Sequence, residues 1–239
     1  MRNSLGWLTI FIIGILSMTT VLALPTGPSS VTNVNSGRYS TAGAAVISAI
    51  AGNVSEINFA ANSITNTWQG YFGNITGTIV LGNSNNQSMY NWNLTSPAGQ
   101  IYATRVASVP AWTNVRCANQ TEINAEDLNI GVNQTVDQDS VNKTFINTTA
   151  FNQFYVGGVN INTSQNCRAV QLYNGSVASS PNFAEVLLSD TTNNIYTGLL
   201  TQDSNGFDNR THDFEMIVGE NGHNGDVATT PYYFYLELH

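Results

Sequence analysis

Residues 67–106 read TWQGYFGNITGTIVLGNSNNQSMYNWNLTSPAGQIYATRV, and this stretch decides the fold class. Runs rich in β-branched and aromatic residues are separated by short turns, at 67–72, 75–81, 88–94 and 101–106. The run 88–94 alternates strictly between two faces, which is typical of a half-buried strand. Gly73-Asn74 between the first two runs predicts a hairpin turn. We therefore expect the four runs to form an antiparallel meander.

Strand patterns resume in the second half of the chain and end with it. They cover 156–161, 168–173, 183–188, 195–200, 212–218 and 232–238. A short helix is expected within 119–131, because Glu126 and Asp127 suit positions near a helix start and Gly131 lies just past its end, and 132–156 is expected to be mostly loop. Many short strands without βα alternation predict an all-β antiparallel sandwich, Ig-like or jelly-roll-like, with at most one or two short helices.

The N-terminus predicts export. Arg2 is followed by an almost wholly apolar run over 6–24 with Ala23 at a cleavage-site spacing, which is typical of a secretory signal peptide. A retained membrane anchor is the alternative, since the run approaches the roughly 20 residues that span a bilayer. We divide the chain into a signal peptide or signal anchor at 1–23, a flexible linker at 24–38, and one β-sandwich domain at 39–239 with a loop and short-helix insertion near 119–156. Residues 39–51 (YSTAGAAVISAIA) are expected to form its first strand, with a helix as the alternative.

Composition narrows the class of protein. Only 9% of the 239 residues are charged, the net charge is −8, and 42% are hydrophobic. The apolar share is enough for a core, so the chain is not of the disordered class. With seven Lys and Arg there is no basic patch for nucleic acid.

Cys117 and Cys167 are the two cysteines of the chain. In an exported protein such a pair is expected to form a disulfide, and closing a loop of about 50 residues contributes roughly 4 kcal/mol. Two buried free thiols are the alternative.

The sequence is dense in acceptor motifs for N-glycosylation. Asn-X-Ser/Thr occurs at Asn53, Asn74, Asn86, Asn93, Asn119, Asn133, Asn142, Asn147, Asn162, Asn174 and Asn209. A chain rich in Asn and Thr produces some of these by chance, but an export signal makes them usable. Asn93 is expected on the polar face of a strand that carries Tyr90 and Trp92 on its other face, and Asn74 at a hairpin tip.

Two blocks resemble a family of exported, largely uncharacterised archaeal cell-surface proteins. The first, 68–105, fits the pattern WxGxxGNxxGxIxL followed by YxW and G-x-x-YA, and the second, 206–238, fits TxDFxMxVxxxG followed by YYFYxEL. The resemblance implies an archaeal lineage and a surface location. It carries no catalytic residues.

The sequence contains only weak motifs for metal binding or catalysis. Asp203, Asn205 and Asp208 resemble part of a Ca²⁺ loop but lack its full spacing and closing Glu, so a plain turn is preferred; no cofactor is expected, with calcium as the alternative. His212, Asp213, Glu215, Glu220 and His223 lack zinc spacing, and we expect Asp213 and Glu215 to face solvent. No HExxH, G-x-S-x-G, Walker or Rossmann pattern is present, so we expect no enzyme.

Aromatic side chains offer one binding hypothesis. On 232–238 the residues Tyr232, Phe234, Leu236 and Leu238 are expected to face the core, which leaves Tyr233 and Tyr235 opposite them as a possible sugar-stacking platform. The other aromatic residues on apolar faces are expected in the core.

These observations predict an exported, N-glycosylated cell-surface structural protein, part of an envelope or an extracellular filament. The alternative is an extracellular carbohydrate-binding or cell-adhesion module. Expected partners are further copies of the chain, other surface proteins or glycans, and a membrane only if the N-terminal segment is retained. In a filament, residues 39–51 are expected to add as a strand to a neighbour's sheet.

Overall fold

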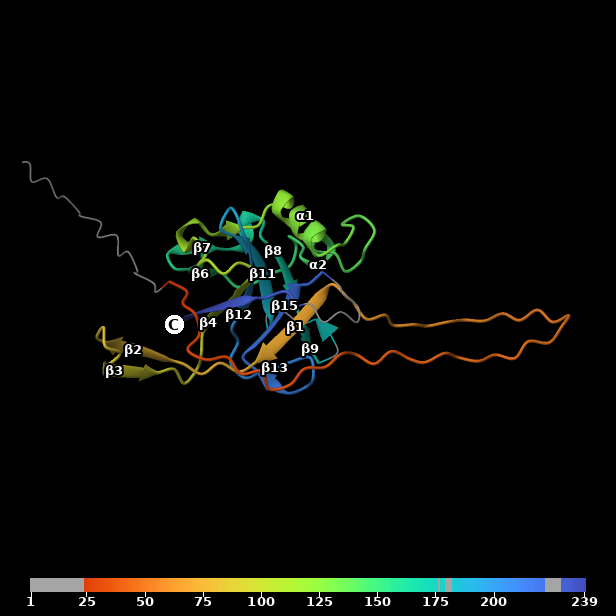
Figure 1. Ribbon diagram of the computed structural model, residues 1–239, viewed down its shortest axis with the longest axis horizontal. Helices are drawn as coiled ribbons and strands as arrows, with labels where there is room; N and C mark the ends of the chain where they lie inside the picture. Colours follow the sequence, from red (N-terminus) through yellow and green to blue (C-terminus); the bar gives the residue numbers. More distant parts are fainter. Residues whose placement is uncertain (1–23, 176, 179–181, 222–228) are drawn as a thin grey trace, which may run out of the picture.

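A six-stranded antiparallel sheet forms the centre of the computed structural model, which describes residues 24–175, 177–178, 182–221 and 229–239 (Figure 1). Its strands run in the order β16 (Tyr233–Leu238), β4 (Gly99–Thr104), β12 (Asn194–Leu199), β11 (Ala184–Ser189) and β5 (Arg116–Cys117), and β8 (Arg168–Gln171) also pairs with β11. All residues of β4 and β11 are buried, because both faces of this sheet are covered. The predicted all-β sandwich-like fold is confirmed.

On one face the sheet is covered by a strand pair and two helices. Strand β1 (Trp68–Gly73) pairs with β15 (Phe214–Gly219), and Met216 and Val218 of β15 pack on Ile101 of β4 and Tyr196 of β12. Helices α1 (Gln120–Asn129) and α2 (Val141–Thr144) contribute to the same apolar cluster. The predicted helix is confirmed, and Gly131 just beyond it has a positive φ of 77°, which favours glycine. The expectation that Glu126 and Asp127 lie near its start is wrong, because the helix begins at Gln120 after the cap Asn119 and both residues are buried in its second half.

The opposite face is covered by a short hairpin and a 3-10 turn. Strands β6 (Phe154–Val156) and β7 (Val159–Ile161) flank a turn at Gly157, so the single strand expected over 156–161 is two. The 3-10 helix η1 (Trp112–Asn114) inserts Trp112 beside Tyr102 and Tyr235. Tyr235 is therefore only 8% exposed, and the expectation that it faces away from the core is wrong because this sheet has a core on each side.

The predicted meander is wrong. Strand β1 pairs with β15, far along the chain, rather than with 75–81. Asn74 does not turn the chain back, since Ile75 is buried and donates its backbone N–H to Asp213 Oδ2 at 2.8 Å. Strand β2 (Thr78–Gly82) instead pairs with β3 (Ser88–Asn93) around the turn 83–87.

Short elements complete the described fold. They are β9 (Tyr173–Asn174) with β10 (Val177–Ala178), β13 (Ser204–Asn205) with β14 (Thr211–His212), and the 3-10 helix η2 (Thr163–Gln165). The strand expected at 39–51 is wrong, because these residues are extended and unpaired. Within the described residues no helix combines the length and the apolarity needed to cross a membrane, and the expected signal segment 1–23 lies outside those residues.

Candidate assembly surfaces

Residues 29–64 form one extended segment that runs along the body as far as 37–39, leaves it as a long two-legged arm and returns at 63–66 (Figure 1). The chain turns back at its tip, where Asn53 N–H donates to the carbonyl of Ile50 at 3.2 Å and Gly52 has a φ of +85°. All these residues are described, and this is the only hydrogen bond between two backbone groups that involves residues 29–64; Ser36 N–H also donates to the side-chain Oδ1 of Asn35. The backbone of both legs is thus open to pairing by another chain.

The arm carries large apolar side chains that are exposed to water. Val46 is 90% exposed, Ile50 70% and Phe59 80%. Others in the same state are Val31, Val34, Tyr39, Ile47, Val54 and Ile57. Arg38 and Glu56 are the only charged residues between 29 and 64. Exposed apolar surface of this extent is typical of interaction sites, so the arm is a candidate assembly surface.

The arm is fixed at its base. On the returning leg, Thr65 and Thr67 donate hydroxyl hydrogen bonds to Asp139 Oδ2 at 2.7 and 3.0 Å, and Trp68 Nε1 donates to the Asp139 carbonyl at 2.6 Å. The hydrogen bond from Thr65 is the main cause that lowers the pKa of Asp139. On the outgoing side, Thr26 exchanges backbone hydrogen bonds with Leu236 on the edge of β16.

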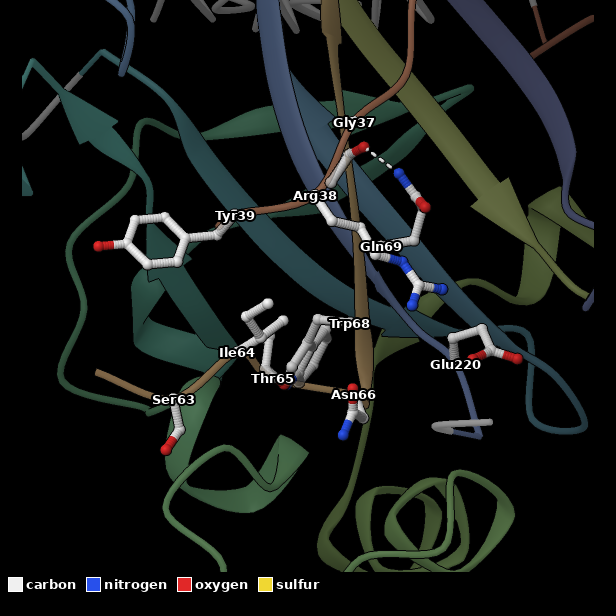
Figure 2. Close-up of a pocket in the computed structure, with 11 residues that line it drawn as sticks. Gly37, Arg38, Tyr39, Ser63, Ile64, Thr65, Asn66, Trp68, Gln69 and Glu220 are labelled. Atoms are coloured by element: carbon white, nitrogen blue, oxygen red, sulfur yellow. Dashed lines mark hydrogen bonds between the residues drawn. The ribbon is translucent and has the colours of Figure 1, made fainter. Parts of the chain in front are cut away.

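Both legs meet the body at one cleft of about 410 Å³ (Figure 2). Its lining comprises Gly37, Arg38, Tyr39, Ser63, Ile64, Thr65, Asn66, Trp68, Gln69, Gly70 and Glu220. Figure 2 shows Ile64 beside Trp68, with Arg38 extending toward the side that holds Gln69 and Glu220. Among the described residues that line it, Glu220 supplies the one carboxylate, and the cleft brings the two ends of the arm together.

The β2–β3 hairpin projects from the opposite end of the molecule (Figure 1). Every residue of both strands is exposed. Its cross-strand pairs place Ile79 opposite Trp92 and Leu81 opposite Tyr90, which gives one apolar face. The expectation that Tyr90 and Trp92 lie in the core is wrong, because no other described strand packs on this hairpin.

The alternating pattern of 88–94 could not reveal this exposure, because alternation indicates that one face of a strand is apolar but not whether another element covers that face. The sequence signal was the pair of glycosylation motifs at Asn86 and Asn93. Asn93 lies on the other face, with Asn91, Thr78 and Val80, as expected.

A third surface lies along the outer edge of β16. A mostly apolar groove of about 480 Å³ is lined by Gly27, Pro28, Val31, Tyr232, Tyr233, Phe234 and Tyr235. Tyr233 is 39% exposed, whereas Tyr235 is buried against Trp112. The two predicted platform residues therefore line one groove, but only Tyr233 offers its ring to a ligand.

None of the candidate glycosylation sites is buried. Eight are exposed, namely Asn53, Asn74, Asn86, Asn93, Asn119, Asn133, Asn147 and Asn209. Asn142, Asn162 and Asn174 are half-buried, and Asn162 donates its Nδ2, the atom that a glycan would occupy, to Asn160 Oδ1 at 2.6 Å. Asn162 is thus the least suited of the eleven.

The predicted disulfide between Cys117 and Cys167 is present. It joins the end of β5 to the residue that precedes β8, so it ties together two short strands that pair with the same neighbour, β11. No free cysteine is present among the described residues.

The weak calcium candidate forms the hairpin β13–β14. Asn205 pairs with Thr211 across this hairpin, and Asp203 has a φ of +47° before it. The Asp208 carboxylate is already bound by Arg210 and by His212 Nε2 at 2.9 Å; burial raises its pKa, but these partners outweigh burial and lower it to about 2. In the described part of the chain no three His, Cys, Asp or Glu side chains lie close enough to hold a metal ion.

The expected solvent-facing carboxylates of 212–218 are buried instead. Asp213 and Glu215 are each 5% exposed, and His223 lies outside the described residues. Asp213 accepts the backbone N–H groups of Ile75 and Asp203, and Glu215 accepts that of Phe207 at 2.8 Å. Both carboxylates thus accept hydrogen bonds from the backbone of loops inside the protein. The spacing of residues in the sequence does not predict this role.

Comparisons of this chain with protein-family models, with curated proteins and with solved structures find no match.

Proposed function

We propose that this chain is an exported, N-glycosylated structural protein that assembles on the cell surface into an envelope or an extracellular filament. The observation that carries the proposal is the arm at 29–64, whose backbone is unpaired and whose apolar side chains face water. In a monomer this surface costs free energy, at roughly 25 cal/mol per Å² of apolar area. Pairing of the arm with a second molecule removes that cost.

The surroundings of the arm support an extracellular setting. The disulfide suits an oxidising compartment, and the N-terminal pattern of residues 1–23 is that of a signal peptide or signal anchor. Exposed glycosylation motifs supply polar surface that this charge-poor chain otherwise lacks. The resemblance to exported archaeal surface proteins points to the same location. The proposal assigns no catalytic step to the chain.

Deletion of the arm tests the proposal. Because 37–39 and 63–66 line the same cleft, a short Gly-Ser linker can replace residues 40–61 without displacing β1. We expect this variant to be exported as a folded, disulfide-bonded monomer, while the parent chain forms large assemblies. Electron microscopy and sedimentation of native material sheared from cells measure both states.

A matched variant separates loss of the arm from loss of its apolar character. Val46→Asp with Ile47→Asp keeps the length of the arm and adds charge to its exposed apolar stretch. We expect it to be monomeric as well. A parent chain that is monomeric in native material, or a deletion variant that assembles as the parent does, would contradict the proposal.

A carbohydrate-binding or adhesion module is the second candidate function, and the groove beside Tyr233 favours it. The measurement is binding to a glycan array, with Tyr233→Ala as the variant. Loss of a glycan signal in this variant would support the module. An array without binding to the parent chain would count against it. Tyr235→Ala is not informative, because this ring packs in the core.

A further inference from the structure

The β2–β3 hairpin is an incomplete sheet. In the described residues β2 pairs only with β3, and both strands are exposed along their whole length. A ribbon of two strands is marginally stable in water, whereas a sheet of three strands that share an apolar face is more stable. The hairpin already has that face, formed by Ile79, Leu81, Tyr90 and Trp92.

The pairing register shows which backbone groups are free. Leu94 N–H donates to the carbonyl of Gly77 at 3.2 Å, in register with the pair Thr78–Asn93. Hydrogen-bonded and non-hydrogen-bonded pairs alternate in an antiparallel ladder, so Thr78 and Val80 direct their N–H and C=O groups to the outer edge of β2. Asn91 and Asn93 do the same on the outer edge of β3.

Glycosylation motifs distinguish these two edges. Asn86 lies in the turn and Asn93 on β3, whereas β2 carries none. A glycan on Asn93 projects from the polar face beside the β3 edge. The edge of β2 and the apolar face stay free of carbohydrate.

The same chain supplies a matching strand. Residues 44–51 of the arm contain no charged side chain and no glycosylation motif, and residues 75–94 contain no charged side chain either. The arm and the hairpin lie at opposite ends of the molecule, so the arm is placed to reach the hairpin of another copy (Figure 1). Contacts of this head-to-tail kind repeat from copy to copy and give an open chain.

We propose that residues 44–51 of one copy add to the outer edge of β2 in a second copy, as the third strand of the β2–β3 sheet. This inference rests on the proposed function and names the partner of the arm. The added strand bonds to the free groups of Thr78 and Val80 and places apolar side chains beside Ile79 and Leu81, which extends the apolar face of the sheet.

A matched pair of proline variants tests the edge. Val80→Pro removes an outward N–H from β2, and Asn91→Pro removes one from β3 at the position directly opposite. Proline is tolerated on a free edge, so neither change breaks the pairing between β2 and β3. We expect Val80→Pro to sediment as a monomer and Asn91→Pro to assemble as the parent chain does. Assembly of Val80→Pro at the parental level would overturn the inference.

A mixing experiment separates this inference from the proposed function. Val80→Pro keeps a working arm, and Val46→Asp with Ile47→Asp keeps a working hairpin, so an equimolar mixture is expected to form heterodimers with one interface and no larger species. A mixture that stays monomeric would overturn the inference. This holds even if Val80→Pro unfolds its own hairpin, because in the mixture the Val80→Pro chain supplies only the arm, and that arm is intact. If the arm variant alone is monomeric while Val80→Pro assembles, the arm docks elsewhere and only the acceptor is wrong. If the arm variant assembles, the proposed function itself fails.

Discussion

At the residue scale, buried carboxyl groups accept hydrogen bonds from backbone N–H groups, in place of backbone carbonyls. Glu185, Glu215 and Glu237 are buried, and they accept the N–H groups of Ile217, Phe207 and Gly157 at 2.8, 2.8 and 3.0 Å. Burial is the main cause that raises the pKa of each carboxyl. A carboxyl with a raised pKa binds its proton more tightly in the folded than in the unfolded chain, so its contribution to stability is largest in acid and is lost as the pH rises.

Glu185 is the clearest case, because it is fully buried and its Oε1 has no partner among the described residues. Glu185→Gln keeps the shape and the acceptor for Ile217 but removes the ionisation. We expect the parent chain to lose stability from about pH 4.5 upward, by at most about 1.4 kcal/mol per pH unit for this group. The variant is expected to lose less between pH 5 and 8.

Urea unfolding at several pH values measures this difference. Glu56→Gln is the control, since Glu56 is exposed on the arm. Parallel pH profiles for the parent chain and Glu185→Gln would show that Glu185 ionises freely in the folded protein.

At the element scale, the features that the sequence predicts well are those that local chemistry decides. Helix α1 begins after Asn119, whose Oδ1 accepts Glu122 N–H at 3.0 Å while Glu122 Oε2 accepts Asn119 N–H at 2.7 Å. Strand patterns at 183–188, 195–200 and 232–238 also predict β11, β12 and β16 to within a residue or so at each end. Turn and capping residues act over a few positions, so they are readable without the fold.

Asn119 is both the helix cap and a candidate glycosylation site, and two variants separate these roles. Thr121→Ala removes the glycosylation motif and leaves the cap, whereas Asn119→Ala removes both. We expect Asn119→Ala to be about 1 kcal/mol less stable to unfolding than Thr121→Ala, because the first turn loses its acceptor. Equal unfolding free energies for the two variants would mean that the cap contributes nothing.

Strand partners, in contrast, could not be predicted. The runs at 67–72 and 75–81 are adjacent and separated by a turn signal, yet β1 pairs with β15. Alternation specifies which residues share a face, but it does not specify the neighbouring strand. Alternation also predicts the wrong burial where both faces of a sheet are covered, as for Tyr235.

At the scale of the whole molecule, the main departure from the predicted domain is the arm. Residues 39–51 have the apolar composition of a core strand, and composition alone places them inside. The structure instead leaves them outside a body that is already covered on both faces of its central sheet. Donation of a strand to a neighbour requires a strand-like segment that does not pair within its own fold, and residues 39–51 are such a segment.

Hydrogen–deuterium exchange of amides 44–51 in native assembled material shows whether the arm of one copy pairs with another. A strand paired with a second copy exchanges slowly, so we predict protection in the assembly, comparable with that of β4 in the central sheet. The same amides in the monomeric variant Val46→Asp with Ile47→Asp are predicted to exchange as fast as those of an open chain. Rapid exchange of residues 44–51 in the parent assembly would contradict the account.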